Sequence, residues 1–453
     1  MSKVQMGAPV SPSGSTSLVE FPGVEECVRY YPPNLETDIE PEAVFSGAQD
    51  AGQEREIEIF VDVPFCESIC GFCPFNVYPA SKADTQTYLN ALAGELRILR
   101  SLVDFGRTKV TTVWIGGGTP SILKEEGLSL LLDLLTDSFN LTALKEFTVE
   151  VKPTLSALTD SKLQLLLAHR VNRISMGVQS THEEYLDLLG RGHTANQALE
   201  IVRLLKDAGF ELNIDMIYRL PGQTLNQVAA DIDSVRALGI DHMSWFPYVP
   251  HDGTALAKKL ELGRVAPQGD RQAYLTMFSL VTERLAEAGY IQYTPYYFTS
   301  GGNCEYHVRR WKMPQSDVLG IGAGAFSFFN GWIYTNEHNP QRYKQRIDGG
   351  RPPVVCSKRL STSEKITRLA VLGIKFFSLN KDQFEREAGV RITEFYANEL
   401  ELLHRLGLID LNEDTIDCTQ LGRAFNNDVA TVFSTDAARR AKHPQAIDFM
   451  RLK

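Results

Sequence analysis

The chain has 453 residues, of which 43% are hydrophobic and 23% charged, and its 46 Lys and Arg against 56 Asp and Glu give a formal net charge of −10. This composition excludes disorder as the overall state, and the length predicts two or three domains or one large barrel with appendages. The acidic balance disfavours nucleic acid and anionic membranes as partners, and no run of about 18 apolar residues predicts a membrane-spanning helix.

The segment 1–55 is rich in Pro, Gly, Ser and acidic residues, which predicts a flexible terminus followed by an extended arm. Its start lacks the long apolar stretch that directs secretion. We therefore expect a cytoplasmic protein, in which the seven cysteines stay reduced.

Residues 56–255 alternate short runs rich in Val, Ile and aromatic residues with stretches of helical periodicity. This alternation predicts an α/β fold with a parallel sheet, either doubly wound or a full or partial barrel. One helix is well bounded, because Thr194 and Gln197 form a capping box and Gly209 ends it. Six strands are expected, at 57–64, 110–116, 147–151, 173–178, 211–218 and 242–248.

In residues 256–360 the alternation fades, and strands with glycine-rich loops are expected to close over the barrel. The aromatic residues between Tyr290 and Trp332 predict either a planar, unsaturated substrate stacked there or ordinary core packing. Residues 361–453 open on a capping box of Ser361 and Glu364 and predict three helices and a wing. The 13 Lys and Arg against 14 Asp and Glu in this module favour a structural cap over DNA binding.

Three cysteines, Cys66, Cys70 and Cys73, follow the first expected strand with the spacing CxxxCxxC. Thiolates this close favour an iron–sulfur cluster or zinc. Zinc is the weaker interpretation, because a structural zinc site has four protein ligands and the first histidine is His169. A disulfide and three unrelated thiols are disfavoured by compartment and by spacing. We expect a [4Fe–4S] cluster with one iron open to a small molecule.

This motif, with Phe72 before the last cysteine, resembles the radical S-adenosylmethionine (SAM) superfamily. The sequences GGGTPS, FTVEVKP, RISMGVQS and NIDMIYRLPGQT follow in an order that resembles the oxygen-independent coproporphyrinogen III oxidase-like (HemN-like) subfamily, over about residues 28–430. The resemblance implies a partial (β/α)6 TIM-like barrel with a C-terminal winged-helix-like α+β domain. It also implies a [4Fe–4S] cluster, two SAM molecules, and an electron donor such as flavodoxin or ferredoxin.

Eight further positions match places where the family contacts SAM. Each position also has an interpretation without SAM. The glycines would form a tight turn, Glu150 a structural salt bridge, Arg191 a surface residue, and Phe75 would simply pack against its neighbours. The eight residues are Phe75, Gly117, Gly118, Thr119, Glu150, Gln179, Arg191 and Asp215.

Two positions depart from the decarboxylases of the subfamily, which carry a fourth cysteine where this chain has Phe75 and a tyrosine where it has Phe60. The haem-chaperone branch shares the aromatic residue at Phe75, and His307 is either a haem ligand or a structural residue. The remaining branch, closest in pattern, contains the class C methyltransferases and cyclopropane-forming enzymes.

We therefore expect a radical SAM enzyme that transfers a SAM-derived methylene to an sp² carbon of an aromatic or heteroaromatic small molecule, by C-methylation or cyclopropanation. A partner methyltransferase is a further expected partner. The alternatives are an oxidative decarboxylase of coproporphyrinogen III and a haem chaperone. Among the other cysteines, Cys304 is expected near the substrate end of the barrel.

Overall fold

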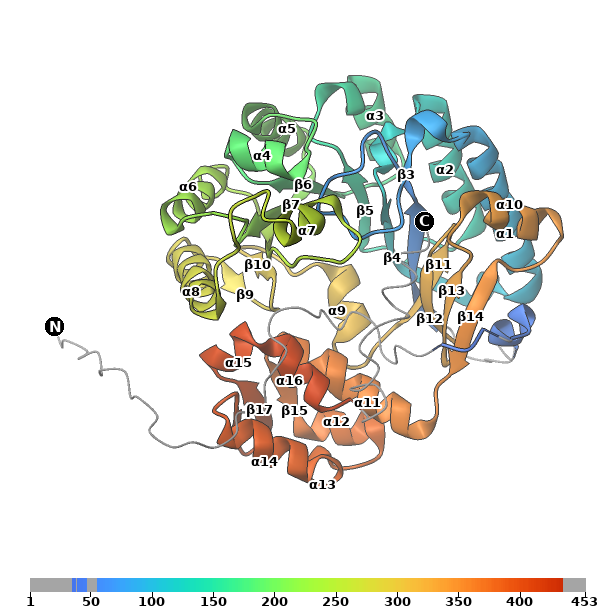
Figure 1. The fold of residues 1–453 in the computed structure, drawn as a ribbon. Coiled ribbons are helices and arrows are strands. Elements are labelled where there is room, and N and C mark those ends of the chain that lie inside the picture. Colours follow the sequence, from blue (N-terminus) through green and yellow to red (C-terminus); the bar gives the residue numbers. More distant parts are fainter. Residues whose placement is uncertain (1–34, 38, 47–54, 435–453) are drawn as a thin grey trace.

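The computed structural model describes residues 35–37, 39–46 and 55–434, so most of the expected N-terminal arm lies outside the described residues. One large sheet curves with helices along its outer side, and a smaller domain lies against it (Figure 1). Among the described residues, no helix is both long and apolar enough to cross a membrane.

Six parallel strands form the centre of the sheet, and each begins and ends within two residues of its expected position. In the described residues the strands form an open order, which agrees with the expected partial barrel. Neighbouring strands are aligned toward their carboxyl ends, where Asp62 pairs with Gly116 and Gly177 with Asp215. The strands, in spatial order, are β1 (Arg55–Val63), β4 (Thr108–Gly117), β5 (Glu146–Val151), β6 (Arg173–Gln179), β7 (Glu211–Tyr218) and β8 (His242–Pro247).

The connecting helices cover the outer face of these strands (Figure 1). The expected capping box of Thr194 and Gln197 is present, and Gly209 follows the helix with a φ of 88°, a conformation that favours glycine. The helices are α1 (Thr85–Leu102), α2 (Glu125–Ser138), α3 (Asp160–Ala168), α4 (Glu183–Leu189), α5 (Ala195–Asp207) and α6 (Leu225–Arg236).

Both edges of the parallel sheet continue with further strands, which bring it to 12 strands. Beside β1 lie β11 (Asp317–Ile321), β12 (Phe326–Phe329), β13 (Trp332–Asn336) and β14 (Val354–Arg359), and beside β8 lie β10 (Tyr297–Thr299) and β9 (Ile291–Gln292). Short strands β2 (Phe65–Cys66) and β3 (Tyr78–Pro79) pair separately. The helices of this region are α7 (Ala255–Glu261), α8 (Arg271–Glu287), α9 (Glu305–Trp311) and α10 (Pro340–Asp348). The 3-10 helices are η1 (Pro41–Phe45), η2 (Ala80–Lys82), η3 (Phe105–Arg107), η4 (Pro120–Ile122), η5 (Leu155–Ala157) and η6 (Ile374–Phe376).

The C-terminal domain has the expected winged-helix-like α+β character. It begins at the predicted capping box of Ser361 and Glu364, and a three-stranded antiparallel sheet forms its wing. Its elements are α11 (Thr362–Gly373), β15 (Ser378–Asn380), α12 (Lys381–Ala388), α13 (Ile392–Phe395), α14 (Ala397–Arg405), β16 (Ile409–Leu411), β17 (Thr415–Cys418), α15 (Gln420–Ala424) and α16 (Asn426–Val432).

Candidate functional site

The cysteine motif lies in the loop 64–77, directly after β1. Backbone hydrogen bonds hold this loop against two neighbours, because Gly71 N–H donates to the Leu189 carbonyl of α4 (2.8 Å) and Leu256 N–H of α7 donates to the Gly71 carbonyl (2.8 Å). Phe72 packs on the small apolar cluster that these helices share. The loop is therefore anchored at the carboxyl ends of the parallel strands, and we call this end of the barrel, with loops 64–77 and 116–121, the mouth.

The three thiols of the motif are half-buried and act on one another electrostatically. Burial raises the pKa of Cys66, and it raises the pKa of Cys73 to about 12, with the neighbouring thiols adding to the rise at Cys73. A buried thiolate needs a compensating positive charge. Iron would supply that charge, since a metal deprotonates the thiols that it binds.

Two side chains from other elements reach these sulfurs. Arg191 donates from Nη1 to Cys70 Sγ (3.2 Å) and from Nη2 to the Gly177 carbonyl at the end of β6 (2.6 Å). Thr119 Oγ1 lies 3.4 Å from Cys66 Sγ. The Arg191 guanidinium thus places a positive charge and a donor beside the cysteine loop, as a site for an anionic cluster requires.

The residues present fit an iron–sulfur cluster. In the part of the chain that the structure describes, no three His, Cys, Asp or Glu side chains converge as the ligands of a single ion would. A [4Fe–4S] cluster instead binds each thiolate through a different iron. When bound, such a cluster supplies a single low-potential electron.

The glycine loop after β4 lies directly against the cysteine loop. Gly118 N–H donates to the Val63 carbonyl (3.0 Å), and Thr119 N–H donates to the Phe65 carbonyl (2.8 Å). A Cβ at Gly118 would lie 2.6 Å from the Phe65 backbone nitrogen, and Gly117 has a φ of 92°. Only glycine permits this close approach, so the turn does more than reverse the chain: it joins the two loops of the mouth.

The predicted polar residues lie in the carboxyl-terminal halves of three neighbouring strands. Glu150 of β5 accepts from Trp114 Nε1 (2.8 Å) and acts electrostatically on Cys66. Gln179, with a φ of 74°, turns its side chain back over Gly177, and the Arg191 guanidinium lies beside the same glycine. Asp215 of β7 accepts from Asn213 Nδ2 (2.9 Å), and burial raises its pKa.

Phe75 is the exposed member of the set, with 43% of its surface accessible, and its backbone hydrogen-bonds to the Cys73 thiol. The structure thus gathers the cysteines, Gly117, Gly118, Thr119, Glu150, Gln179 and Arg191 around the mouth, and Asp215 acts electrostatically with Arg191. Their contacts to SAM stay predictions.

One acidic residue of the mouth, Asp62, is absent from the residues expected from the sequence. Asp62 lies on β1 between the fully buried Val61 and Val63, and only 7% of it is exposed. The reasoning applied to Glu150, an acid between two valines of an apolar strand, fits Asp62 equally well. That pattern could have identified it.

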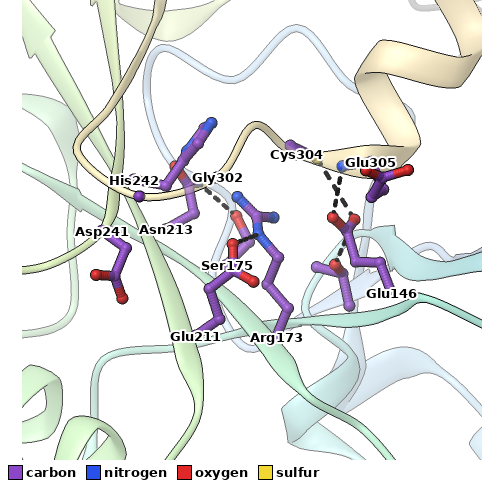
Figure 2. A network of polar contacts seen from close by, with 12 residues as sticks. Glu146, Arg173, Ser175, Glu211, Asn213, Asp241, His242, Gly302, Cys304 and Glu305 are labelled. Atoms are coloured by element: carbon purple, nitrogen blue, oxygen red, sulfur yellow. Dashed lines mark hydrogen bonds and ion pairs between the residues drawn. The ribbon is translucent and has the colours of Figure 1, made fainter. Parts of the chain in front are cut away.

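The opposite end of the strands holds a buried polar network (Figure 2). Glu146, the first residue of β5, accepts from Glu305 N–H (2.8 Å) and from the Cys304 thiol (3.4 Å), and Arg173 begins β6 beside it. The expectation that Cys304 lies near the substrate end is therefore wrong. Its contacts anchor α9 at the amino ends of the strands.

The aromatic residues expected at a substrate site pack mostly against one another. Tyr297 and Trp311 are each less than 10% exposed, and the His307 ring stacks on both, with centroids 4.5 and 5.0 Å apart. Ordinary core packing, the alternative interpretation, accounts for these three rings.

Family models match two regions of the chain: the radical SAM superfamily at residues 60–235 and the HemN C-terminal domain at residues 360–425. The chain is 32% identical to the haem chaperone HemW of Lactococcus lactis over 355 residues, which cover 75% of this chain and 89% of that protein. It is 29% identical to the oxygen-independent coproporphyrinogen III oxidase of Salmonella typhimurium over 435 residues, covering 92% and 93%.

Among solved structures, the chain resembles coproporphyrinogen III oxidase (HemN) from Escherichia coli, described as a radical SAM enzyme. The TM-score is 0.78 at 25% sequence identity, and the match covers 89% of this chain and 95% of that one.

These relatives overturn the expected methylene transfer. They are haem chaperones and coproporphyrinogen oxidases, so C-methylation, cyclopropanation and a partner methyltransferase lose their support. The expected cofactors hold at the level of the superfamily, which uses a [4Fe–4S] cluster and SAM. The chain belongs to the radical SAM superfamily and, within it, to the HemN-like family of haem chaperones and oxygen-independent coproporphyrinogen III oxidases.

Proposed function

We propose that this protein is a radical SAM haem chaperone, a protein that binds haem and keeps the cluster and SAM sites of its family. The observation that carries the proposal is the pair Phe60 and Phe75, which replace the tyrosine and the fourth cysteine expected of a decarboxylase. The similarity to HemW proteins supports the same assignment.

The surroundings of the two phenylalanines agree with the proposal. Phe60 packs against an apolar group that contains Trp114, Tyr306 and Val318, and it offers no hydroxyl to a substrate. Phe75 is exposed beside Cys73, where a planar ligand could stack on its ring. His307 remains a proposed haem ligand, although freeing its ring requires separation from Tyr297 and Trp311.

The SAM site of this proposal uses the residues of the mouth. Gly117, Gly118 and Thr119 would bind the methionyl part, and the backbone near Phe75 would lie on the adenine side. Glu150, Gln179, Arg191 and Asp215 would supply the polar contacts for one or two SAM molecules. The electron for the cluster would come from a flavodoxin or ferredoxin.

We also infer a cytoplasmic location, because the six described cysteines are all free thiols.

Oxidative decarboxylation of coproporphyrinogen III is the second candidate. It is supported by the likeness to the solved HemN structure, which extends over 95% of that chain. The two candidates share the cluster and SAM and differ in what happens to the tetrapyrrole.

Anaerobic reconstitution followed by two assays separates them. A haem chaperone should take up one haem per chain in a titration followed by visible absorption, and it should release no CO₂ from coproporphyrinogen III with SAM and a reductant. CO₂ together with 5′-deoxyadenosine, without haem uptake, would establish the decarboxylase. If the protein takes up no haem and releases no CO₂, both candidates are overturned. Cys70→Ala serves as the variant expected to lose the cluster.

A further inference from the structure

The carboxyl group of Asp62 differs from the other buried carboxylates of the barrel. Its Oδ1 is buried and has no hydrogen-bond partner among the described residues, while 7% of the residue is exposed. Leaving a buried carboxylate without a donor costs several kcal/mol, so native proteins rarely do so without a functional reason.

Other buried carboxylates of this chain show how such a group is normally satisfied. Glu58 lies on the same strand and accepts from the hydroxyls of Thr111 and Thr112. Glu95 accepts from Tyr343 Oη (2.5 Å), Asn336 Nδ2 (2.8 Å) and Gly322 N–H (2.8 Å). Asp231 accepts from Ser180 and Thr181. Each is provided with donors from the protein, whereas Asp62 Oδ1 is not.

The surroundings of Asp62 indicate what kind of group would bind its Oδ1. It pairs in register with Gly116 at the end of β4, and its Oδ1 lies against Gly117, where a side chain would overlap it. A second acidic group is Glu150, whose Oε1 lies against Gly116, the residue that pairs with Asp62, and whose charge acts on Asp62 and on Cys66. Two carboxyl groups therefore face the same space beside the cysteine and glycine loops.

Two neighbouring acids repel one another, and both are stabilised when a cation lies between them. We infer that Asp62 forms, with Glu150, a binding site for a positively charged group of a ligand in the mouth, namely the ammonium or the sulfonium of SAM. The inference rests on the proposed SAM site and adds Asp62 to it as a residue that contacts the ligand.

The test measures binding rather than turnover. Wild type, Asp62→Asn and Asp62→Ser are reconstituted anaerobically to equal iron content, and the Kd values for SAM and S-adenosylhomocysteine are measured by equilibrium dialysis. The matched control is Glu58→Gln, because Glu58 is a buried acid of the same strand that has its own donors. Loss of a charge-assisted contact should weaken SAM binding about tenfold or more in both Asp62 variants and leave the control unchanged.

The second ligand identifies the group that is bound. S-adenosylhomocysteine keeps the ammonium but lacks the sulfonium charge, so weakening of SAM alone assigns Asp62 to the sulfonium, and equal weakening of both ligands assigns it to the ammonium. SAM affinity within about twofold of wild type in both Asp62 variants would overturn the inference. Wild type that binds no SAM would overturn the SAM site itself, and the haem titration tests the chaperone function separately.

Discussion

The Arg191 side chain connects the cysteine loop to the end of β6. One guanidinium donates to Cys70 Sγ and to the Gly177 carbonyl, a geometry that a lysine ammonium cannot reproduce with a single nitrogen. We predict that Arg191→Gln lowers the midpoint potential of the reconstituted cluster, because the added electron loses a nearby positive charge and a donor to sulfur. A redox titration followed by electron paramagnetic resonance measures the shift.

The control for this prediction is Arg203→Gln, since Arg203 is an exposed cation of α5. The same decrease in both variants would mean that overall charge, rather than the contact to Cys70, sets the potential. An unchanged potential in Arg191→Gln would contradict the prediction directly.

Glu150 and Asp62 show what single residues reveal in a sequence. Both are acids between valines, but only Glu150 falls within a motif that the family resemblance assigns to SAM. The contacts that distinguish a satisfied carboxylate from an unsatisfied one come from other strands. They cannot be read from the local sequence.

The contact between the glycine loop and the cysteine loop requires a residue without a side chain at Gly118. A methyl group at Gly118 would lie 2.6 Å from the backbone of Phe65. We predict that Gly118→Ala lowers the free energy of unfolding by about 1–3 kcal/mol and reduces iron incorporation, because the two loops must separate. Iron and sulfide content with urea unfolding checks both effects, and Gly302→Ala, which has open space for the methyl group, should change neither.

Glu95 links α1 to the loop after β11 and to α10, and burial raises its pKa to about 7. The Glu95 carboxyl stays protonated to a higher pH in the folded protein than in the unfolded chain. The free energy of unfolding should therefore fall as the pH rises from about 4.5 to about 7, and then level off. The contribution is at most about 3 kcal/mol.

Glu95→Gln removes this titration. We predict that the difference in unfolding free energy between wild type and Glu95→Gln changes in favour of the variant between pH 5 and pH 7, as measured by urea unfolding at each pH. A difference that does not vary with pH would contradict the assigned pKa.

The parallel strands could be predicted from the sequence because each is a short apolar run bounded by turn residues, with a helix of clear periodicity between. The sequence indicated β12, β13 and β14 only as strands and loops that close the barrel. It did not indicate that α9 lies at the amino ends of the parallel strands. Those arrangements depend on pairing between segments far apart in sequence, as with Cys304 and Glu146.

For the molecule as a whole, the fold and cofactors were predictable and the chemistry was not. The cysteine motif and glycine loop serve an entire superfamily, whereas methylation, decarboxylation and haem binding are separated by a few side chains of the mouth. The expectation of methylene transfer rested on positions such as Phe75, which the haem chaperones share. The relatives that match over most of their length are haem chaperones and coproporphyrinogen oxidases, and they remove the methyltransferase branch.

The barrel and the C-terminal domain are joined by specific contacts, which predicts that they unfold together. Tyr274 Oη of α8 donates to the Ala424 carbonyl of α15 (2.6 Å), and Asn427 Nδ2 of α16 donates to Tyr296 Oη (2.5 Å). All four tryptophans precede residue 361, so their fluorescence follows the barrel, with Trp311 also lying under Lys375 of the C-terminal domain, while circular dichroism reports on both parts.

Two matched substitutions test this cooperativity. Tyr274→Phe removes a hydroxyl that joins the two parts, and Tyr290→Phe removes one that donates to the Ile240 carbonyl at the same distance of 2.6 Å within the barrel. Each should lower the unfolding free energy by about 1 kcal/mol, with fluorescence and circular dichroism giving coincident urea transitions. If the parts unfold independently, the circular dichroism transition of wild type will separate from the fluorescence transition, and the prediction fails.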